Sequence, residues 1–238
     1  MGVVCALRSE ARHLGHTLSR HPHLDALPDG LLLAVTGIGC AAAAAGAQSL
    51  VASGAAGLAS FGLAGGLDPA LPAGTIFLPS EIAAQDGALL STDATWRARV
   101  RAALNGRAPI DAGRLVTTRH PVAVVAEKAA LFQASGARAV DMESFGVAEV
   151  ARSCGVPFIA VRVIVDAAEE TLPQAVIAAT DAAGHTSLLQ LLGQLARRPR
   201  ELRSLVRLAH GYHRANRSLA AVARTGALAL FATAAELP

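Results

Sequence analysis

The sequence has few aromatic residues and no long uncharged apolar run. Aromatic side chains make up 3% of the 238 residues, and we attribute this to a compositional bias towards Ala and Arg. No stretch reaches the ~18 apolar residues that a membrane-spanning helix needs. The first apolar run, residues 2–7, is too short for a signal peptide. The sequence therefore predicts neither a transmembrane nor a secreted protein.

Cysteine is also scarce. Cys5, Cys40 and Cys154 are odd in number and lack the spacing of metal ligands. Each has apolar neighbours in the sequence, which favours three buried free thiols. We expect no metal site and a reducing, cytoplasmic location.

The charge of the chain is distributed unevenly. Residues 1–196 carry 13 Lys and Arg against 16 Asp and Glu, a net charge of −3, whereas residues 197–238 carry 8 Arg against 2 Glu, a net charge of +6. This pattern argues against a general nucleic-acid-binding surface. Hydrophobic residues make up 53% of the chain, enough for a large core. We expect a catalytic domain over residues 1–196 and a basic, apolar helical extension over residues 197–238.

Short apolar segments alternate with helical ones along the first 196 residues. Buried strands separated by helices are typical of a parallel sheet covered on both faces. The sequence thus predicts an α/β protein, a three-layer α/β/α sandwich with a central mixed, mostly parallel sheet. The predicted strands are 3–6, 31–35, 57–63, 75–78, 114–118, 137–140 and 158–165, and the predicted helices are 10–18, 41–52, 96–104, 123–133, 143–154 and 182–195.

Four polar clusters follow predicted strands: residues 8–10, 36–39, 141–143 and Asp166. In open α/β sheets, ligands bind outside the carboxyl ends of the strands. The clusters could therefore form one pocket containing the carboxylates of Glu10, Glu143 and Asp166. Taken singly, each carboxylate has an ordinary alternative: Glu10 and Glu143 could be acidic residues in the first turn of a helix, and Asp166 could be a helix N-cap. His120, which follows another predicted strand, could be an ordinary loop residue.

The order and spacing of three segments favour a functional role for these residues. Residues 140–144 (VDMES), 155–158 (GVPF) and 161–166 (VRVIVD) resemble the signature of the purine nucleoside phosphorylase/uridine phosphorylase superfamily. Residues 6–10 (ALRSE) and the glycine turns at 36–39 and 61–67 resemble those of the methylthioadenosine/adenosylhomocysteine nucleosidases. The resemblance covers about residues 1–195 and implies a nucleoside phosphorylase-like fold and an N-ribosyl-cleaving enzyme.

The resemblance also implies roles for individual residues. Asp166 matches the acid that protonates the leaving purine, and Glu10 matches the base that activates water. Glu143 matches the carboxylate that accepts hydrogen bonds from the ribose hydroxyls, and Met142 matches the thioether that packs on the sugar. The residues expected to contact the base and the rest of the substrate are Ala64, Gly65, Pro121, Val122 and Val165.

The sequence leaves the nucleophile open. A carboxylate at Glu10 suits water and repels phosphate, whereas Arg8, Thr36 and Gly37 could form a phosphate or nucleophile site. Two reactions therefore remain: hydrolysis, and phosphorolysis of a purine nucleoside to a ribose 1-phosphate, with phosphate as co-substrate. Neither needs an organic cofactor or a metal. A non-catalytic nucleoside-binding or membrane scaffold protein is the alternative from a different class.

Three departures from the nucleosidase pattern point to a more apolar pocket. Val165 stands where the nucleosidases usually have Ser before the acid, and Leu63 stands where they commonly have Ser. Residues 119–122 (RHPV) replace a segment that places an aromatic residue on the base. These changes suggest a substrate other than plain methylthioadenosine.

The extension has an amphipathic pattern. Arg203, Arg207, His210, Arg214 and Arg217 recur at helical spacing, and Leu202, Leu205, Val206 and Ala209 lie largely on another face. Such a helix either packs on its own domain or a dimer partner, or lies against anionic lipid. A core followed by such a tail resembles the hopanoid-biosynthesis-associated phosphorylase-like enzymes. That resemblance implies release of adenine from adenosylhopane and peripheral contact with the inner face of the membrane. Because the superfamily commonly assembles with neighbouring subunits completing pockets, we expect a cytoplasmic homodimer, with no nucleic-acid partner.

Overall fold

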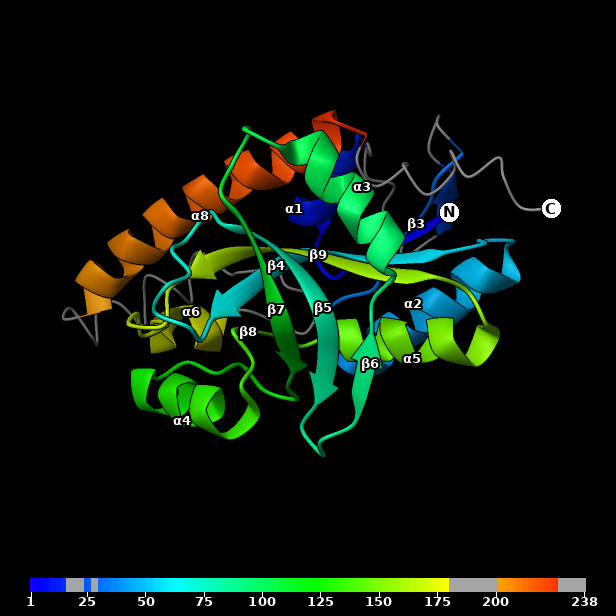
Figure 1. Cartoon of the computed structure of the whole chain (residues 1–238). Coiled ribbons are helices and arrows are strands. Elements are labelled where there is room, and N and C mark those ends of the chain that lie inside the picture. Colours follow the sequence, from blue (N-terminus) through cyan, green and yellow to red (C-terminus); the bar gives the residue numbers. More distant parts are fainter. Residues whose placement is uncertain (16–23, 27–29, 180–200, 227–238) are drawn as a thin grey trace.

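The computed structural model describes residues 1–15, 24–26, 30–179 and 201–226. These residues form one mixed nine-stranded sheet between two layers of helices (Figure 1). The fold class therefore agrees with the prediction. The strands are β1 Gly2–Cys5, β2 Leu24–Ala26, β3 Leu32–Val35, β4 Leu58–Gly66, β5 Ile76–Ala84, β6 Leu89–Ser91, β7 Ile110–Thr117, β8 Ala139–Asp141 and β9 Phe158–Asp166.

The strand order is β2-β3-β1-β4-β8-β7-β5-β6, with β9 pairing with both β4 and β5. Strands β3, β1, β4 and β9 run parallel, so their carboxyl ends point in one direction. Strands β5, β7 and β8 are parallel to one another but antiparallel to β9 and β4. The sheet is thus two parallel groups joined through antiparallel pairs.

Helices cover both faces of this sheet. They are α1 Arg8–Ala11, α2 Cys40–Ala52, α3 Ala94–Leu104, α4 Val125–Ser135, α5 Ser144–Cys154, α6 Gln174–Ala179 and α8 Leu202–Arg224. Helices α2 and α5 lie on one face, whereas α1, α3 and α8 lie on the other (Figure 1). Val3 and Val4 point into different core clusters because successive strand residues face opposite sides. The sheet therefore has a separate apolar core on each face.

Small residues allow α2 and α5 to pack closely. A Cβ on Gly146 would collide with the carbonyl oxygen of Cys40, so glycine is needed where these helices meet. Helix α5 begins at Ser144, directly after the polar residues at 141–143. This packing fixes the start of α5 at the edge where β4 and β9 end.

Several elements differ from their predicted bounds. The helix expected over residues 10–18 is α1 followed by a short 3₁₀ turn, and it ends at Gly15 in the left-handed region at φ 82°. Strand β5 is longer than predicted, and β2, β6 and α6 were not predicted because short segments carry little periodicity. The helix predicted at 182–195 lies outside the described residues. Cys5 is buried as expected, but Cys154 is exposed; it is the last residue of α5, where the helix leaves the sheet.

Helix α8 packs across β9 through the second half of its length (Figure 1). Its buried residues are Gly211, Ala215, Ser218, Leu219, Ala221 and Val222. The apolar residues predicted at its beginning do not share this contact: Leu202 is 56% and Val206 is 47% exposed. Among the described helices, none is both long enough and apolar enough to cross a membrane.

Candidate active site

A cavity of about 200 Å³ opens where β4, β8 and β9 end. It brings together all nine residues predicted for catalysis, ribose binding and base binding. They are Glu10, Ala64, Gly65, Pro121, Val122, Met142, Glu143, Val165 and Asp166, and the rest of the lining comprises Ala6, Leu7, Ile38, Leu63, Thr118, Val140, Asp141 and Leu172. Most of this wall is apolar, as the departures from the nucleosidase pattern predict.

Strands β8 and β9 both pair with the end of β4. Gly65 pairs with Asp166 of β9 on one side and with Val140 of β8 on the other. Because β8 runs antiparallel to β4, Asp141 and the residues after it reach the cavity from the opposite direction. A Cβ on Gly65 would stand 3.2 Å from Val140 and 3.5 Å from Asp166 Oδ1. Glycine therefore keeps the backbone open to a ligand beside the acid.

Arg162, in the middle of β9, does not line the cavity but pairs with two carboxylates that do. Its side chain is 1% exposed and pairs with Asp141 at 2.7 Å, with Glu143 following at 3.6 Å. It also donates to the hydroxyls of Ser60 and Ser144. A buried guanidinium needs such partners to offset its lost hydration. Arg162 is thus a buried counter-ion that keeps the neighbouring carboxylates in place.

Glu10 is buried in this cavity, with 3% of its surface exposed. This excludes a solvated first-turn residue. Its Oε2 accepts from Leu7 N and its Oε1 from Leu63 N, each at 2.9 Å. Burial raises the pKa of the Glu10 carboxyl, whereas Arg162 and these backbone donors lower it. The donors hold Glu10 as an acceptor with both oxygens fixed.

Glu143 lies before the first turn of α5 and is also buried. Its Oε1 accepts from Gly39 N at 3.0 Å, so the glycine turn after β3 supports this carboxylate. Burial raises the pKa of Glu143 to about 7, with Arg162 opposing the shift and Asp141 adding to it. Glu143 therefore changes charge close to neutral pH.

Asp166 is the last residue of β9 and is 2% exposed. It is not the N-cap of a helix, since α6 begins only at Gln174. Its Oδ2 accepts from the buried ammonium of Lys128, which reaches in from α4. Burial raises the pKa of Asp166 and Lys128 opposes that shift. A buried carboxyl with a raised pKa is suited to carry a proton.

The residues proposed for phosphate do not join this cavity. Arg8, Thr36 and Gly37 are absent from its lining. The Thr36 hydroxyl instead donates to Gly37 O at 3.0 Å. His120 is exposed in its loop. Within the described part of the chain, no group of three or more His, Cys, Asp or Glu side chains is placed to hold a metal ion.

Sequence reasoning gave no role to Arg162, Lys128, Thr118 or Leu172. Arg162 and Lys128 are the buried cations, whereas Thr118 and Leu172 complete the wall. The signal for Lys128 is compositional: it is the only lysine in the chain, whose other basic residues are all arginine. Arg162 lies inside the signature segment and could have been recognised as a polar residue within an apolar strand.

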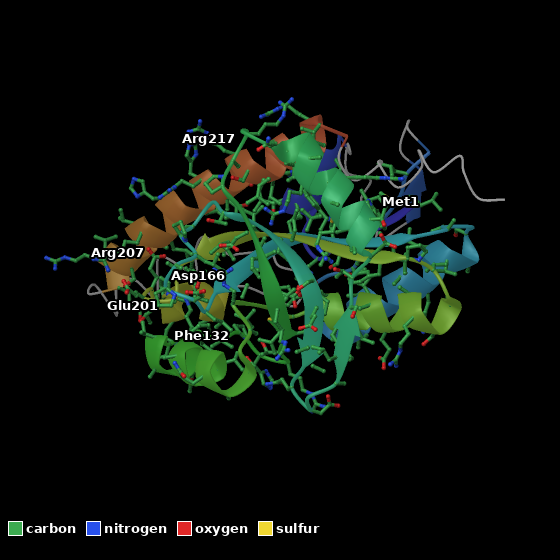
Figure 2. The ribbon with its side chains drawn as sticks, in the orientation of Figure 1. Met1, Phe132, Asp166, Glu201, Arg207 and Arg217 are labelled. Atoms are coloured by element: carbon green, nitrogen blue, oxygen red, sulfur yellow. The ribbon has the colours of Figure 1, made fainter. Side chains whose placement is uncertain are left out.

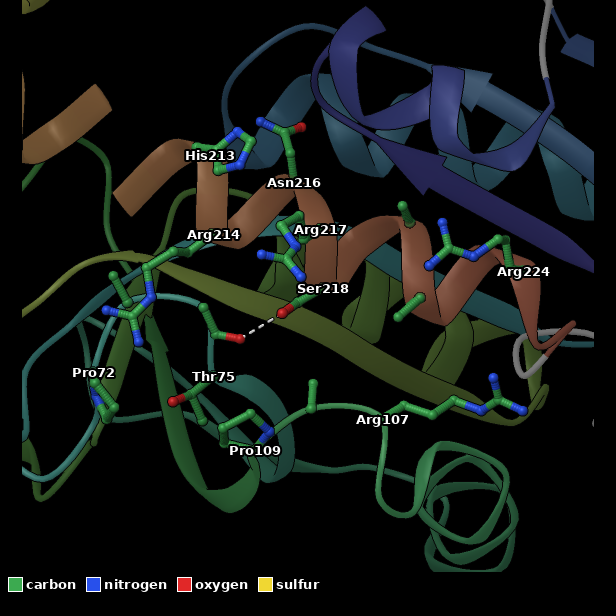
Figure 3. Close-up of a pocket in the computed structure, with 15 residues that line it drawn as sticks. Pro72, Thr75, Arg107, Pro109, His213, Arg214, Asn216, Arg217, Ser218 and Arg224 are labelled. Atoms are coloured by element: carbon green, nitrogen blue, oxygen red, sulfur yellow. Dashed lines mark hydrogen bonds between the residues drawn. The ribbon is translucent and has the colours of Figure 1, made fainter. Parts of the chain in front are cut away.

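A second, larger hollow of about 520 Å³ lies between α8 and the segments at 72–75 and 107–109 (Figure 3). It is lined by Arg107, His213, Arg214, Arg217 and Arg224 and contains no carboxylate. Figure 2 shows Arg207 and Arg217 extending outward from α8, whereas Asp166 lies within the body of the molecule. The chemistry described above thus belongs to the smaller cavity.

Comparisons with known proteins agree with this architecture. Residues 29–197, more than half of the chain, match the family model described as Phosphorylase superfamily. A 5′-methylthioadenosine/S-adenosylhomocysteine nucleosidase from Neisseria meningitidis, solved with methylthio-immucillin-A, superposes with a TM-score of 0.69 at 18% identity, covering 94% of this chain and 96% of that one. Futalosine hydrolase of Helicobacter pylori gives 0.69 at 16% identity, with 94% and 95% covered. No curated protein matches the sequence. At these identities the solved structures show a shared fold.

Proposed function

This chain belongs to the phosphorylase superfamily, and on that premise we propose that it hydrolyses the N-glycosidic bond of a 5′-substituted adenosine and releases adenine. Membership makes it a nucleosidase or a nucleoside phosphorylase. The observation that carries the choice of hydrolysis is the lining of the cavity. Glu10, Glu143 and Asp166 face it, and no Arg, Lys or His among the described residues does. A phosphate anion would meet carboxylates there, whereas water would meet a base.

Each carboxylate has a separate task in the proposed reaction. Cleavage of the bond between C1′ and N9 leaves an oxocarbenium-like sugar and an electron-rich purine. Asp166, whose pKa is raised by burial, gives a proton to N7 in the proposed reaction, so that neutral adenine leaves. Glu10 takes a proton from the water whose oxygen attacks C1′. Ionised Glu143 accepts hydrogen bonds from the ribose hydroxyls and stabilises the developing positive charge.

The apolar wall supports a hydrophobic 5′ substituent, and we propose adenosylhopane as the substrate. Ile38, Leu63 and Leu172 line the cavity together with Met142, Pro121 and Val122. The beginning of α8 places exposed Leu202 and Val206 beside Arg203 and Arg207, an arrangement suited to an anionic lipid surface. We propose peripheral contact of this extension, residues 197–238, with the membrane that holds such a substrate.

The proposal is tested by incubating the protein with adenosylhopane, methylthioadenosine and inosine, with and without phosphate, and by assaying free base and sugar products. In water enriched in ¹⁸O, hydrolysis places the heavy oxygen on C1′ of the ribose. Phosphate should not change the rate. A strict need for phosphate, with ribose 1-phosphate as product, would establish phosphorolysis instead.

The acid is tested by Asp166→Asn, which keeps the shape of the side chain but cannot supply a carboxyl proton. We expect kcat for adenine release to fall by about 100- to 10,000-fold. Binding of the nucleoside, measured by calorimetry, should remain. Unchanged adenine release would refute the assignment of Asp166.

A further inference from the structure

The only lysine of the chain is buried against the proposed acid. The 21 basic residues comprise 20 arginines and Lys128. Lys128 is 0% exposed. It is also the one buried residue of α4, whose neighbouring side chains Glu127 and Ala129 face solvent. A lysine retained in an arginine-biased chain, and pointing inward from an exposed helix, calls for a specific partner.

The partners of Lys128 use its full donor capacity. Its ammonium donates to Asp166 Oδ2, to Ala167 O at 2.7 Å and to Glu170 O at 2.8 Å. An ammonium has three donors and no acceptor, so no proton is left unpaired. A compact ammonium fits between three converging oxygens, whereas the planar fork of a guanidinium does not share that geometry. Lys128 thus joins the acid and the segment after β9 to α4.

This contact leaves the two oxygens of Asp166 in different surroundings. Lys128 donates to Oδ2, and it is the only side chain among the described residues that donates to Asp166. Both oxygens lie near Gly65, where an added Cβ would stand 3.5 Å from Oδ1 and 3.6 Å from Oδ2. Gly65 and Asp166 both line the cavity. The segment tied by Lys128 continues to Leu172, whose N–H donates to Ala123 O at 2.9 Å and whose side chain lines the same wall. Because Lys128 occupies Oδ2, the oxygen left to meet a ligand is Oδ1.

We propose that Lys128 is a positioning residue for the acid, which holds Asp166 by Oδ2, directs Oδ1 to the purine and stabilises the carboxylate formed when the proton leaves. This inference rests on the proposed function. The proton on Oδ1 passes to purine N7 as the bond between N9 and C1′ breaks, and Lys128 keeps all its protons. Because the ammonium interacts more strongly with the new carboxylate than with the neutral acid, it favours the transition state over the ground state.

A purely structural ion pair would behave differently. The charged groups nearest Asp166 are Lys128 from α4 and Glu170 from the following segment, with Glu10 and Glu143 lining the same cavity. Removing only the cation raises the pKa of Asp166, so the acid stays protonated to higher pH. The alkaline limb of the kcat profile then moves to higher pH while kcat itself falls. Loss of stability alone leaves the position of that limb unchanged.

The experiment compares Lys128→Met and Lys128→Arg with the wild type on adenosylhopane and on p-nitrophenyl riboside, whose phenolate leaves without protonation. We expect Lys128→Met to lower kcat on the nucleoside by about 100-fold, to move the alkaline limb upward and to change the rate on the phenyl riboside by less than about threefold. Lys128→Arg keeps the positive charge beside Asp166 but not the ammonium geometry, so the limb should stay near its wild-type position while kcat falls. Equal losses on both substrates with an unmoved limb would overturn the proposal.

A second measurement does not need the variants to be active. Protein labelled with ¹³C at lysine Cε gives one side-chain resonance, since the chain has one lysine. We expect the chemical shift of this resonance to change when Asp166 is replaced by Asn. A resonance that ignores Asp166→Asn would overturn the pairing. A wild type that cleaves neither substrate would instead refute the proposed function and leave the NMR result standing.

Discussion

Gly62 lies directly against Glu10: a Cβ built on Gly62 would stand 2.5 Å from Glu10 Oε1 and 2.7 Å from Arg162 Nη1. The glycine thus makes room for a carboxylate and its buried counter-ion and not for a ligand. Its neighbours in the strand constrain the backbone, since Phe61 is buried and Leu63 is half-buried. The strand therefore cannot move away easily. The absence of a side chain at position 62 lets Glu10 enter the cavity.

Gly62→Ala should therefore disable the site without changing the surface. We expect a loss of about 1–3 kcal/mol in the free energy of unfolding from overpacking, and at least a tenfold fall in kcat because Glu10 is displaced. Urea denaturation and steady-state kinetics measure both. Gly54→Ala is the control, since it lies in an exposed turn and meets nothing within 4 Å, although its φ of 90° adds local strain. Normal activity of Gly62→Ala would contradict this role.

Arg162→Met should destabilise the whole domain. The change leaves Asp141, Glu143 and Glu10 buried beside one another without the cation that compensates them. Breaking a buried ion pair on one side costs about 3–5 kcal/mol, and urea denaturation measures it. Arg152→Met is the matched control on α5, because Arg152 is 65% exposed and its pair with Glu149 spans 3.9 Å. Similar stabilities of the two variants would show that Arg162 is dispensable.

The contacts of Arg162 and Lys128 mark the limits of sequence analysis. All strands except β2 and β6, most helices and the nine cavity residues were predicted because each depends on local periodicity or on a signature segment. Arg162 meets Ser60 across 102 positions, and Lys128 meets Asp166 across 38. The first pair depends on the pairing of β4 with β9 and the second on how α4 packs beside β9, which no local pattern encodes.

Arg8 and Glu10 show a further limit. Both belong to one polar cluster in the sequence, but residues two apart on a helix point to nearly opposite sides. Only Glu10 faces the cavity in the structure. The sequence could identify the cluster, but the direction of each side chain depended on the rotation of α1, which packing against β1 and β4 determines.

The pH dependence of binding should follow Glu143. Its pKa of about 7 means that it loses the ability to accept two ribose hydrogen bonds as the pH falls below neutral. We expect KM for the nucleoside to rise by about tenfold per unit below pH ~7 and to be constant above it. Glu143→Gln should have a raised KM that no longer varies over this range. A wild-type KM that is constant from about pH 5 to 8 would contradict the role of Glu143.

The exposed beginning of α8 should govern binding to lipid. We expect the wild type to cosediment with phosphatidylglycerol vesicles, less so as salt rises, since the attraction is partly electrostatic. Arg203→Gln with Arg207→Gln should weaken binding by about 10- to 30-fold, from ~1 kcal/mol per charge. Leu202→Ser with Val206→Ser should weaken it independently of salt. Leu89→Ser on β6 is the control, because Leu89 is 43% exposed at another place on the surface. Equal binding by all four proteins would favour α8 as a packing helix only.

The identity of the nucleophile should separate Glu10 from Arg8. Glu10→Gln keeps the size of the side chain and removes the base that deprotonates water, so we expect kcat to fall by about 100- to 10,000-fold. Arg8→Gln should change kcat by less than about threefold, because Arg8 does not line the cavity. Added phosphate should rescue neither variant. If Arg8→Gln instead abolished turnover and Glu10→Gln became dependent on phosphate, the cation would be binding the nucleophile, and the carboxylate would serve only to exclude it from an otherwise phosphorolytic site.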